Sequence, residues 1–229
     1  MILVEFTGLP GCGKTTLCDK LEEELANRDI RVCNLQKEKE IKNIFGRLSY
    51  SLYIRKVKKA ECNNVLNAEI RRMNNLLGIK ETDHWEEKIL EANYRCIEAE
   101  KKGEQVALFD EGCIQYIVSL LADADVDERQ YNIIKEIEKT IYGSRTIIIN
   151  CALDEETSLD RINSRGRWCC GVHDTDREGG LAILRHRRSN IDLIMEKLEK
   201  VKILTVSTKD GNGDNALKEV LNAVTENIG

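Results

Sequence analysis

A glycine-rich loop close to the first residue has the residue types and spacing that bind a phosphate group. Residues 8–15 read Gly-Leu-Pro-Gly-Cys-Gly-Lys-Thr and match the pattern G-x-x-x-x-G-K-[ST]. An apolar, strand-like run (2–7) precedes the loop, and the helix-like segment LCDKLEEEL follows it. Because the pattern holds nucleotides in this strand–loop–helix context, we interpret residues 8–15 as a phosphate loop.

Each residue type in the phosphate loop serves the binding of a nucleotide. The glycines allow backbone conformations that turn N–H groups toward an anion, and the following helix points its positive N-terminus at the same anion. We expect Lys14 to reach the β- and γ-phosphates and the Thr15 hydroxyl to ligate Mg²⁺. The nucleotide-binding residues expected here are Gly8, Pro10, Gly11, Cys12, Gly13, Lys14, Thr15 and Thr16.

Two adjacent carboxylates, Asp110 and Glu111, stand at the end of a second apolar run, residues 105–110. Ligands of parallel α/β sheets gather at the carboxyl ends of the strands, so we expect both acids near the phosphate loop. One acid could hold Mg²⁺, directly or through water, and one could accept a proton from an attacking hydroxyl. Which acid has which role stays open, because consecutive side chains of a strand point in different directions.

Three arginines, Arg161, Arg165 and Arg167, stand close together further along the chain. Arg161 and Arg165 are four residues apart and would share a helix face, while Arg167 follows Gly166, where the helix is expected to end. Guanidinium groups that close over a transferring phosphoryl group compensate its negative charge. A surface helix end whose basic residues complement the helix dipole is the alternative. The phosphate loop and the acid pair favour phosphoryl transfer.

The elements that must position these residues alternate between strand-like and helix-like segments. Short runs rich in β-branched residues are separated by amphipathic segments, which predicts a mainly parallel sheet with helices on both faces. Residues 37–103 break the alternation, because they contain helix-like patterns without a convincing strand. We expect them to form a helical insert. The five expected strands are residues 2–7, 31–36, 105–110, 145–151 and 201–207.

The composition predicts one globular domain. Hydrophobic residues make up 41% and charged residues 33% of the 229 residues, as in soluble proteins. The net charge of −5 argues against a dedicated nucleic-acid binder. The sequence has no apolar run of about 20 residues, the length that crosses a bilayer. Nine scattered cysteines without a signal peptide indicate reduced thiols. We therefore expect a cytoplasmic protein with neither nucleic-acid nor membrane partners.

These motifs together resemble those of the P-loop nucleoside and nucleotide kinases. The loop GLPGCGKTT is similar to the phosphate loop of these kinases. The spacing Arg161-x₃-Arg165-x-Arg167 is similar to the lid of deoxynucleoside kinases and thymidylate kinases. The resemblance extends over residues 1–36 and 104–225. At the position of Glu111, both families place an arginine that helps to bind the acceptor.

The resemblance implies a P-loop NTPase fold of three α/β/α layers, with a five-stranded parallel sheet of order 2-3-1-4-5. It implies one kinase-like domain over residues 1–229, with an acceptor-binding insert at 37–103 and an arginine lid at 161–178. It also implies ATP with Mg²⁺ as the phosphoryl donor. The loop after the last expected strand resembles the segment that borders adenine in such kinases, which adds Lys209 to the expected nucleotide-binding residues.

The expected function is the transfer of the γ-phosphoryl group of ATP to a small-molecule acceptor. The resemblance favours a nucleoside or a nucleoside monophosphate, as in thymidylate kinases. A regulatory P-loop ATPase that binds nucleotide without a small-molecule acceptor is the alternative, and a homodimer is one assembly that the sequence allows. We expect Thr15 and Asp110 to bind the metal ion. The residues expected to act in catalysis are Lys14, Asp110, Glu111, Arg161, Arg165 and Arg167.

Overall fold

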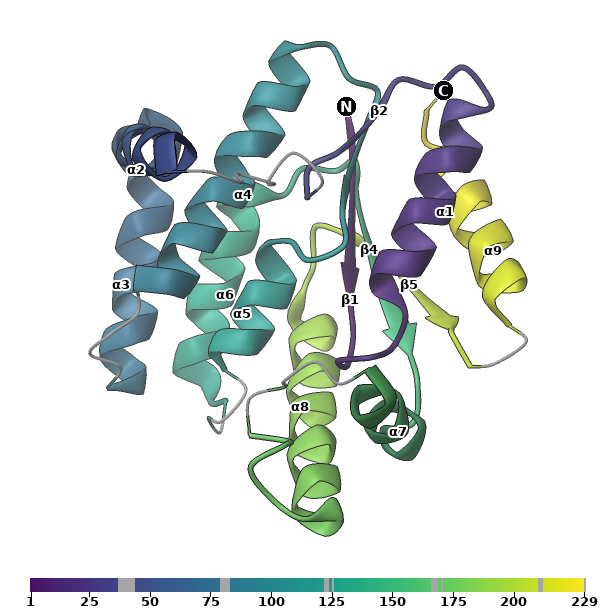
Figure 1. The fold of residues 1–229 in the computed structure, drawn as a ribbon. Helices are drawn as coiled ribbons and strands as arrows, with labels where there is room; N and C mark the ends of the chain where they lie inside the picture. Colours follow the sequence, from purple (N-terminus) through teal and green to yellow (C-terminus); the bar gives the residue numbers. More distant parts are fainter. Residues whose placement is uncertain are drawn as a thin grey trace.

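The structure of the chain, a computed structural model, contains a five-stranded sheet between two layers of helices (Figure 1). The strands pair in parallel in the order β2-β3-β1-β4-β5, which confirms the expected topology. The described residues are 1–36, 44–78, 83–121, 124, 126–165, 169, 171–209 and 212–228.

The strands coincide closely with the runs expected from the sequence. All residues of the central strand β1 are buried, because helices cover both of its faces. The edge strand β2 is shorter than expected, since the chain turns at residues 35 and 36 and three positions pair with β3. The strands are β1 (Ile2–Thr7), β2 (Val32–Asn34), β3 (Val106–Phe109), β4 (Thr146–Ala152) and β5 (Lys202–Ser207).

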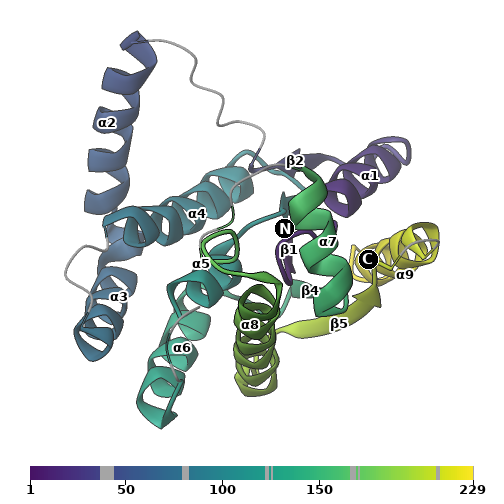
Figure 2. The ribbon, with the colours of Figure 1, turned by 60° about the horizontal axis from the view of Figure 1, so that its bottom comes forward.

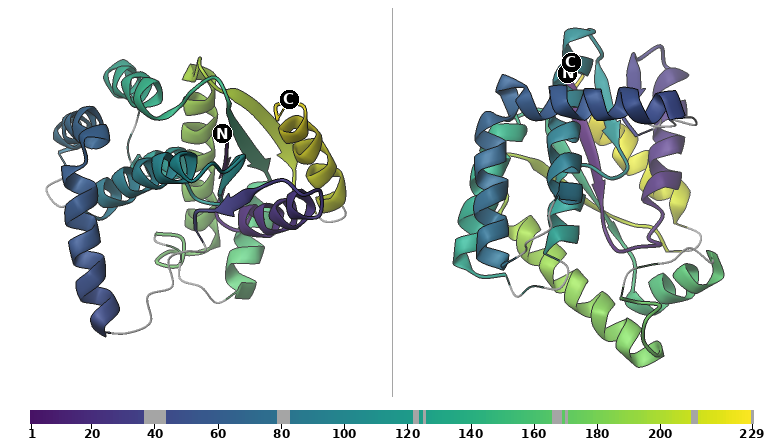
Figure 3. Two further views of the ribbon diagram at one scale, coloured as in Figure 1. Left: turned by 90° about the horizontal axis from the view of Figure 1, so that it is seen from above. Right: turned by 60° about the vertical axis from the view of Figure 1, so that its left-hand side comes forward.

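Different helices cover the two faces of the sheet, as the left-hand view of Figure 3 shows. On the first face α1 packs against α9. On the second face α5 contacts α4 and α8, and α6 contacts α8. These helices are α1 (Lys14–Ala26), α9 (Gly213–Thr225), α4 (Asp83–Lys101), α5 (Cys113–Leu120), α6 (Glu128–Ile141) and α8 (Arg177–Lys197).

Most of the described chain between β2 and β3 is helical, and none of its described residues forms a strand. It forms α2 (Ile44–Lys59), a 3₁₀ turn (Glu61–Asn63), α3 (Asn64–Leu77) and then α4. Helix α3 packs on α6, and α4 packs on α5, so this segment extends the second helical layer away from the sheet. None of the helices within the described ranges combines the length and apolar character that crossing a membrane requires.

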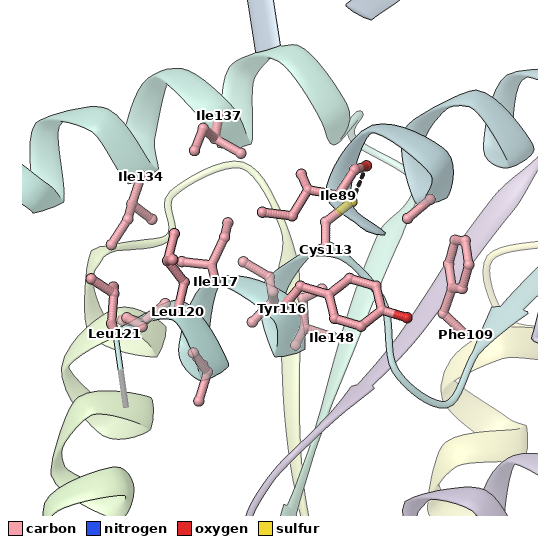
Figure 4. Packing of buried hydrophobic residues seen from close by; sticks show 14 of the residues in the cluster. Ile89, Phe109, Cys113, Tyr116, Ile117, Leu120, Leu121, Ile134, Ile137 and Ile148 are labelled. Atoms are coloured by element: carbon pink, nitrogen blue, oxygen red, sulfur yellow. Dashed lines mark hydrogen bonds between the residues drawn. The ribbon is translucent and has the colours of Figure 1, made fainter. Parts of the chain in front are cut away.

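Helix α5, which begins directly after the acid pair, is fixed by a dense apolar core. Its residues Cys113, Tyr116 and Ile117 are almost fully buried among side chains of α4, α6 and the sheet (Figure 4). The Cys113 thiol donates a hydrogen bond to the carbonyl oxygen of Ile89 in α4, at 3.6 Å. A helix buried on this many sides has little freedom to shift, because interiors are close-packed. The start of α5 is therefore fixed in position relative to the sheet and to the residues around it.

Candidate active site

The phosphate loop has the backbone geometry that its glycines predict. Gly8, Gly11 and Gly13 have φ values of 143°, 80° and 90°, in the region that favours glycine. At Gly8 a side chain is also excluded by space, because a Cβ would lie 2.7 Å from the carbonyl oxygen of Cys151. The loop leads directly into α1, whose first residue is Lys14. The phosphate loop thus directly precedes the N-terminus of α1, the end of a helix that attracts anions.

Lys14 lies across the phosphate loop and is almost fully buried. Its Nζ donates hydrogen bonds to the carbonyl oxygens of Gly8 at 3.1 Å and Leu9 at 3.2 Å, and lies 3.8 Å from Cys12 Sγ. Burial alone would lower the pKa of Lys14, but the negative charges of Cys12 and Glu111 outweigh burial and raise it. The ammonium group therefore stays charged at neutral pH, held against the loop.

The acid pair divides between two environments. Thr15 Oγ1 donates a hydrogen bond to Asp110 Oδ2 at 2.9 Å, and Asp110 is 8% exposed. The other oxygen, Asp110 Oδ1, is buried and has no hydrogen-bond partner among the described residues. Glu111 is exposed and lines a cavity together with Lys14 and Thr15. The two carboxylates follow one another in sequence, yet one reaches Thr15 and the other faces the cavity.

The arginine-bearing helix α7 (Glu155–Arg165) lies at the carboxyl ends of β1 and β4, the side of the molecule that faces the reader in Figure 2. Ser158 Oγ in α7 donates to the carbonyl oxygen of Pro10 at 2.6 Å, which ties the helix to the phosphate loop. Arg161 donates to the carbonyl oxygens of Gly11 at 3.3 Å and Thr208 at 3.2 Å. The described part of the helix runs to Arg165, and Gly166, where the helix was expected to end, lies outside the described residues.

The three arginines have different surroundings. Arg161 is partly buried and bridges the phosphate loop and the segment after β5. Arg165 is exposed and lines two cavities beside the loop. Arg167 lies outside the described residues. Arg161 is thus held by carbonyl groups, whereas Arg165 presents its charge to the cavities.

Two cavities adjoin at the start of α1 and share Gly13, Thr16 and Arg165. The first, of about 260 Å³, is lined by Pro10, Gly11, Gly13, Lys14, Thr15, Thr16, Glu111, Ile162, Arg165 and Cys169. The second, of about 230 Å³, is lined by Gly13, Thr16, Leu17, Lys20, Arg161, Arg165, Thr208, Gly213 and Ala216.

In the segment after β5, Thr208 lines the second cavity, whereas Lys209 lines neither of the two cavities. Lys209 Nζ instead lies 3.3 Å from Asp154 Oδ2, in an exposed ion pair. Lys209 lines a separate hollow of about 350 Å³ that also contains Glu155 and Arg188. The structure therefore brings together the expected residues of the phosphate loop, the acid pair, Arg161 and Arg165, but sets Lys209 to one side.

Sequence reasoning missed a buried hydrogen-bond network behind the loop. Gln115 Oε1 accepts hydrogen bonds from Thr7 Oγ1 and from the Gly8 amide, both at 3.2 Å. Glu5, in β1, is 0% exposed and accepts hydrogen bonds from the amides of Ile114 and Gln115. Burial raises the pKa of Glu5 to about 7, although these hydrogen bonds act in the opposite direction.

One sequence signal could have revealed part of this network. Glu5 is a carboxylate inside the apolar run ILVEFT, and a buried carboxylate needs hydrogen-bond donors. Tyr142 supplies one of them, because its hydroxyl donates to Glu5 Oε2 at 2.7 Å. Gln115 has no such signal, since a glutamine in the mostly apolar segment CIQYIVSL is compatible with an exposed position.

No protein-family model and no curated protein sequence matches the chain. Solved structures are similar along almost its whole length. Deoxyadenosine kinase from M. mycoides with bound dATP aligns with a TM-score of 0.51 at 14% identity, over 98% of this chain and 100% of that chain. The same kinase with the products dCMP and a flexible dCDP aligns with a TM-score of 0.50 at 13% identity, with the same coverage.

A second protein gives the same result. The YorR protein from Bacillus subtilis, in complex with phosphorylated GDP, aligns with a TM-score of 0.51 at 14% identity, over 97% of this chain and 95% of that chain. At identities this low, the structural similarity establishes the fold alone. The chain has the fold of the P-loop nucleoside kinases, with a sheet of order 2-3-1-4-5 and helices on both sides.

Proposed function

We propose that the protein is a kinase that transfers the γ-phosphoryl group of ATP, with Mg²⁺, to a nucleoside or a nucleoside monophosphate. The observation that carries this proposal is the first cavity, because Lys14, Thr15, Glu111 and Arg165 all line it. Phosphoryl transfer needs a donor cradle, a carboxylate for the acceptor and a compensating cation in one place. The nucleotides bound by the structurally similar deoxyadenosine kinase and YorR protein support the same reading.

The residues beside the phosphate loop fit a magnesium ion. Thr15 and Asp110 offer a hydroxyl and a carboxylate, the hard oxygen ligands that Mg²⁺ prefers, in direct contact at 2.9 Å. The buried Asp110 Oδ1 has no hydrogen-bond partner among the described residues, so it has an acceptor site to offer. When bound, Mg²⁺ would neutralise charge on the phosphates of the nucleotide.

The donor nucleotide is proposed to extend from the first cavity into the second. The phosphate loop amides and Lys14 would hold the phosphates in the first cavity. The second cavity combines the apolar Leu17 and Ala216 with the guanidinium of Arg161, a planar group that can stack on a nucleobase. Because Arg161 is fixed by two carbonyl groups, it would offer a preformed surface. Arg165 would then compensate charge on the transferring group.

The acid pair is proposed to have divided roles. Asp110 is engaged with Thr15, so it would serve the metal ion. Glu111 faces the cavity and would accept the proton of the acceptor hydroxyl while the acceptor oxygen bonds to the γ-phosphorus. The bond from that phosphorus to the bridging oxygen breaks, and ADP leaves. A phosphate acceptor would need no such base, since its oxygen is already ionised.

The proposal assigns the remaining parts of the chain as well. The chain forms one kinase domain that works in the cytoplasm. Residues 37–103 bind the acceptor, and residues 161–178 close over the site as a lid. Closure would exclude water from the transferring phosphoryl group and limit hydrolysis.

The experiment that tests this function follows ADP formation from ATP and Mg²⁺ with a panel of nucleosides, nucleoside monophosphates, sugars and small alcohols. We expect one nucleoside or nucleoside monophosphate class to stimulate ADP formation strongly above the acceptor-free rate. Stimulation by a sugar or an alcohol would overturn the acceptor class. Slow hydrolysis that no acceptor changes would overturn the kinase and favour the regulatory ATPase.

A further inference from the structure

Gln115 connects the start of α5 to the first glycine of the phosphate loop. Its side chain is 9% exposed, and its Oε1 accepts from Thr7 Oγ1 and from the Gly8 amide. A backbone amide can only donate, so the Gln115 atom that faces Gly8 must be the oxygen. The orientation of this side-chain amide is thus determined by its surroundings.

Gly8 is held from both sides. Its amide donates to Gln115 Oε1, and its carbonyl oxygen accepts from Lys14 Nζ. Its φ of 143° belongs to a region in which the backbone of glycine is unusually free. Hydrogen bonds at both peptide groups therefore restrict a residue that has little conformational preference of its own. The direction of the amides that follow depends on how Gly8 is held.

Gln115 is itself fixed by the buried carboxylate of Glu5. Glu5 accepts hydrogen bonds from the amides of Ile114, at 2.5 Å, and Gln115, at 3.2 Å. Amides in the first turn of a helix have no acceptor within the helix, so the carboxylate takes that place. The Tyr142 hydroxyl orients the same carboxylate. Gly112 lies so close to it that a Cβ would be 2.4 Å from Glu5 Cδ. The position of α5 along β1 is therefore closely defined.

The acid pair lies just before this helix, since Gly112 alone separates Glu111 from α5. We propose that Gln115 is a positioning residue, which holds Gly8 and the phosphate loop in alignment with Asp110 and Glu111. Gln115 acts through Gly8 and makes no contact with the nucleotide. This inference rests on the proposed function in that a nucleotide must bind at the loop.

Two substitutions, Gln115→Met and Gln115→Leu, remove the acceptor oxygen and put an apolar side chain of similar size in its place. Losing the bond to Gly8 should weaken the binding of ATP with Mg²⁺ by about tenfold, because a buried amide is left without its acceptor. Thr7→Val removes only the second donor, so its effect should be within about twofold. Ser119→Ala is the matched control, since its hydroxyl bonds to the Gln115 carbonyl oxygen on the same helix.

The measurement is a calorimetric titration of each variant with ATP and Mg²⁺, without an acceptor, well below the thermal midpoint of the least stable variant. Hydrogen exchange at the Gly8 amide, followed by NMR, is measured alongside. We expect both Gln115 variants to lose affinity and to exchange faster at Gly8, while Thr7→Val and Ser119→Ala stay near the parent protein.

The outcomes distinguish failure of the positioning role from failure of the proposed function. Unchanged affinity and unchanged exchange at Gly8 in the Gln115 variants would overturn the positioning role, whatever the acceptor panel shows. Equal losses in Ser119→Ala would also overturn it, because the effect would then belong to the helix as a whole. A parent protein that binds no nucleotide would overturn the proposed function, and this inference with it.

Discussion

The Thr15 hydroxyl donates a hydrogen bond to Asp110 Oδ2 at 2.9 Å, although 95 residues separate them in the sequence. The contact follows from the sheet, because β1 and β3 are adjacent and parallel and their carboxyl ends lie side by side. Thr15 lies in the first turn of α1, whereas Asp110 directly follows β3. One topological relationship thus places a hydroxyl and a carboxylate together beside the phosphate loop.

Asp110→Asn should separate phosphoryl transfer from nucleotide binding. The amide keeps the hydrogen bond from Thr15 but loses the charge that would hold Mg²⁺, so we expect kcat to fall by about 10²–10³. ATP affinity should change only a few-fold, because the loop and Lys14 are untouched. Steady-state kinetics and a nucleotide titration check this. Glu136→Gln, at an exposed ion pair in α6, is the control. An Asn variant with unchanged kcat would contradict the role of Asp110.

Arg161 and Arg165 should respond differently to replacement by alanine. Arg165 is exposed and lines both cavities, so Arg165→Ala should lower kcat by about 10² with no change in thermal stability. Arg161 donates to two carbonyl groups, so Arg161→Ala should raise the KM for ATP and also lower the thermal midpoint. Kinetics and thermal unfolding of both variants test this contrast. Identical effects of the two substitutions would refute it.

Glu5 should make the stability of the protein depend on pH. Its pKa is about 7 in the folded chain against 4.5 for an ordinary glutamate, chiefly because of burial. Between these values the native state binds more protons than the unfolded chain, so the free energy of unfolding falls as pH rises. The contribution of Glu5 is fully present below pH 4.5 and is lost by about pH 7. Its size is on the order of 3 kcal/mol.

Glu5→Gln removes this titration and keeps an oxygen for the amides of Ile114 and Gln115. The unfolding free energy of the variant minus that of the parent protein should therefore increase from pH 4.5 to about 7. Urea unfolding at several pH values measures this difference. A difference that stays constant with pH, or that decreases, would show that Glu5 does not have a raised pKa in the folded chain.

Gly112→Ala tests how tightly the start of α5 approaches β1. The added methyl group would lie 2.4 Å from Glu5 Cδ, and the buried carboxylate cannot move aside without losing its hydrogen bonds. We expect a loss of about 1–3 kcal/mol in unfolding free energy, typical of overpacking. Gly143→Ala is the matched control, because a Cβ there meets no atom within 4 Å. Equal stabilities of the two alanine variants would contradict the close approach.

The sheet and the phosphate loop could be predicted from the sequence because residues close together in the sequence determine their conformation. The apolar runs predicted the strands to within a few residues, and the glycine spacing predicted the backbone turn before α1. The structure differs from the sequence-based expectation where contacts between residues distant in the sequence set the local conformation. β2 is shorter than its run, since the chain turns at residue 35. Lys209 forms an exposed ion pair with Asp154, and Thr208 lines the second cavity.

The division of the acid pair and the network behind the loop could not be predicted in the same way. Sequence alone could not say which of Asp110 and Glu111 reaches Thr15, because that depends on how the chain leaves β3. The partners of Gln115 lie about a hundred residues away, on β1 and the loop, and nothing local marks the contact. Long-range hydrogen bonds of this kind become visible only once the strand order is known.

A kinase of the proposed kind passes the phosphoryl group from ATP to a small-molecule acceptor. The most direct test incubates the protein with ATP labelled in the γ-phosphoryl group, Mg²⁺ and the acceptor that stimulates turnover most, and then separates the labelled products. We expect the label in the phosphorylated acceptor, with one labelled molecule for each ADP formed. Label recovered only as inorganic phosphate, at a rate that no acceptor changes, would contradict it.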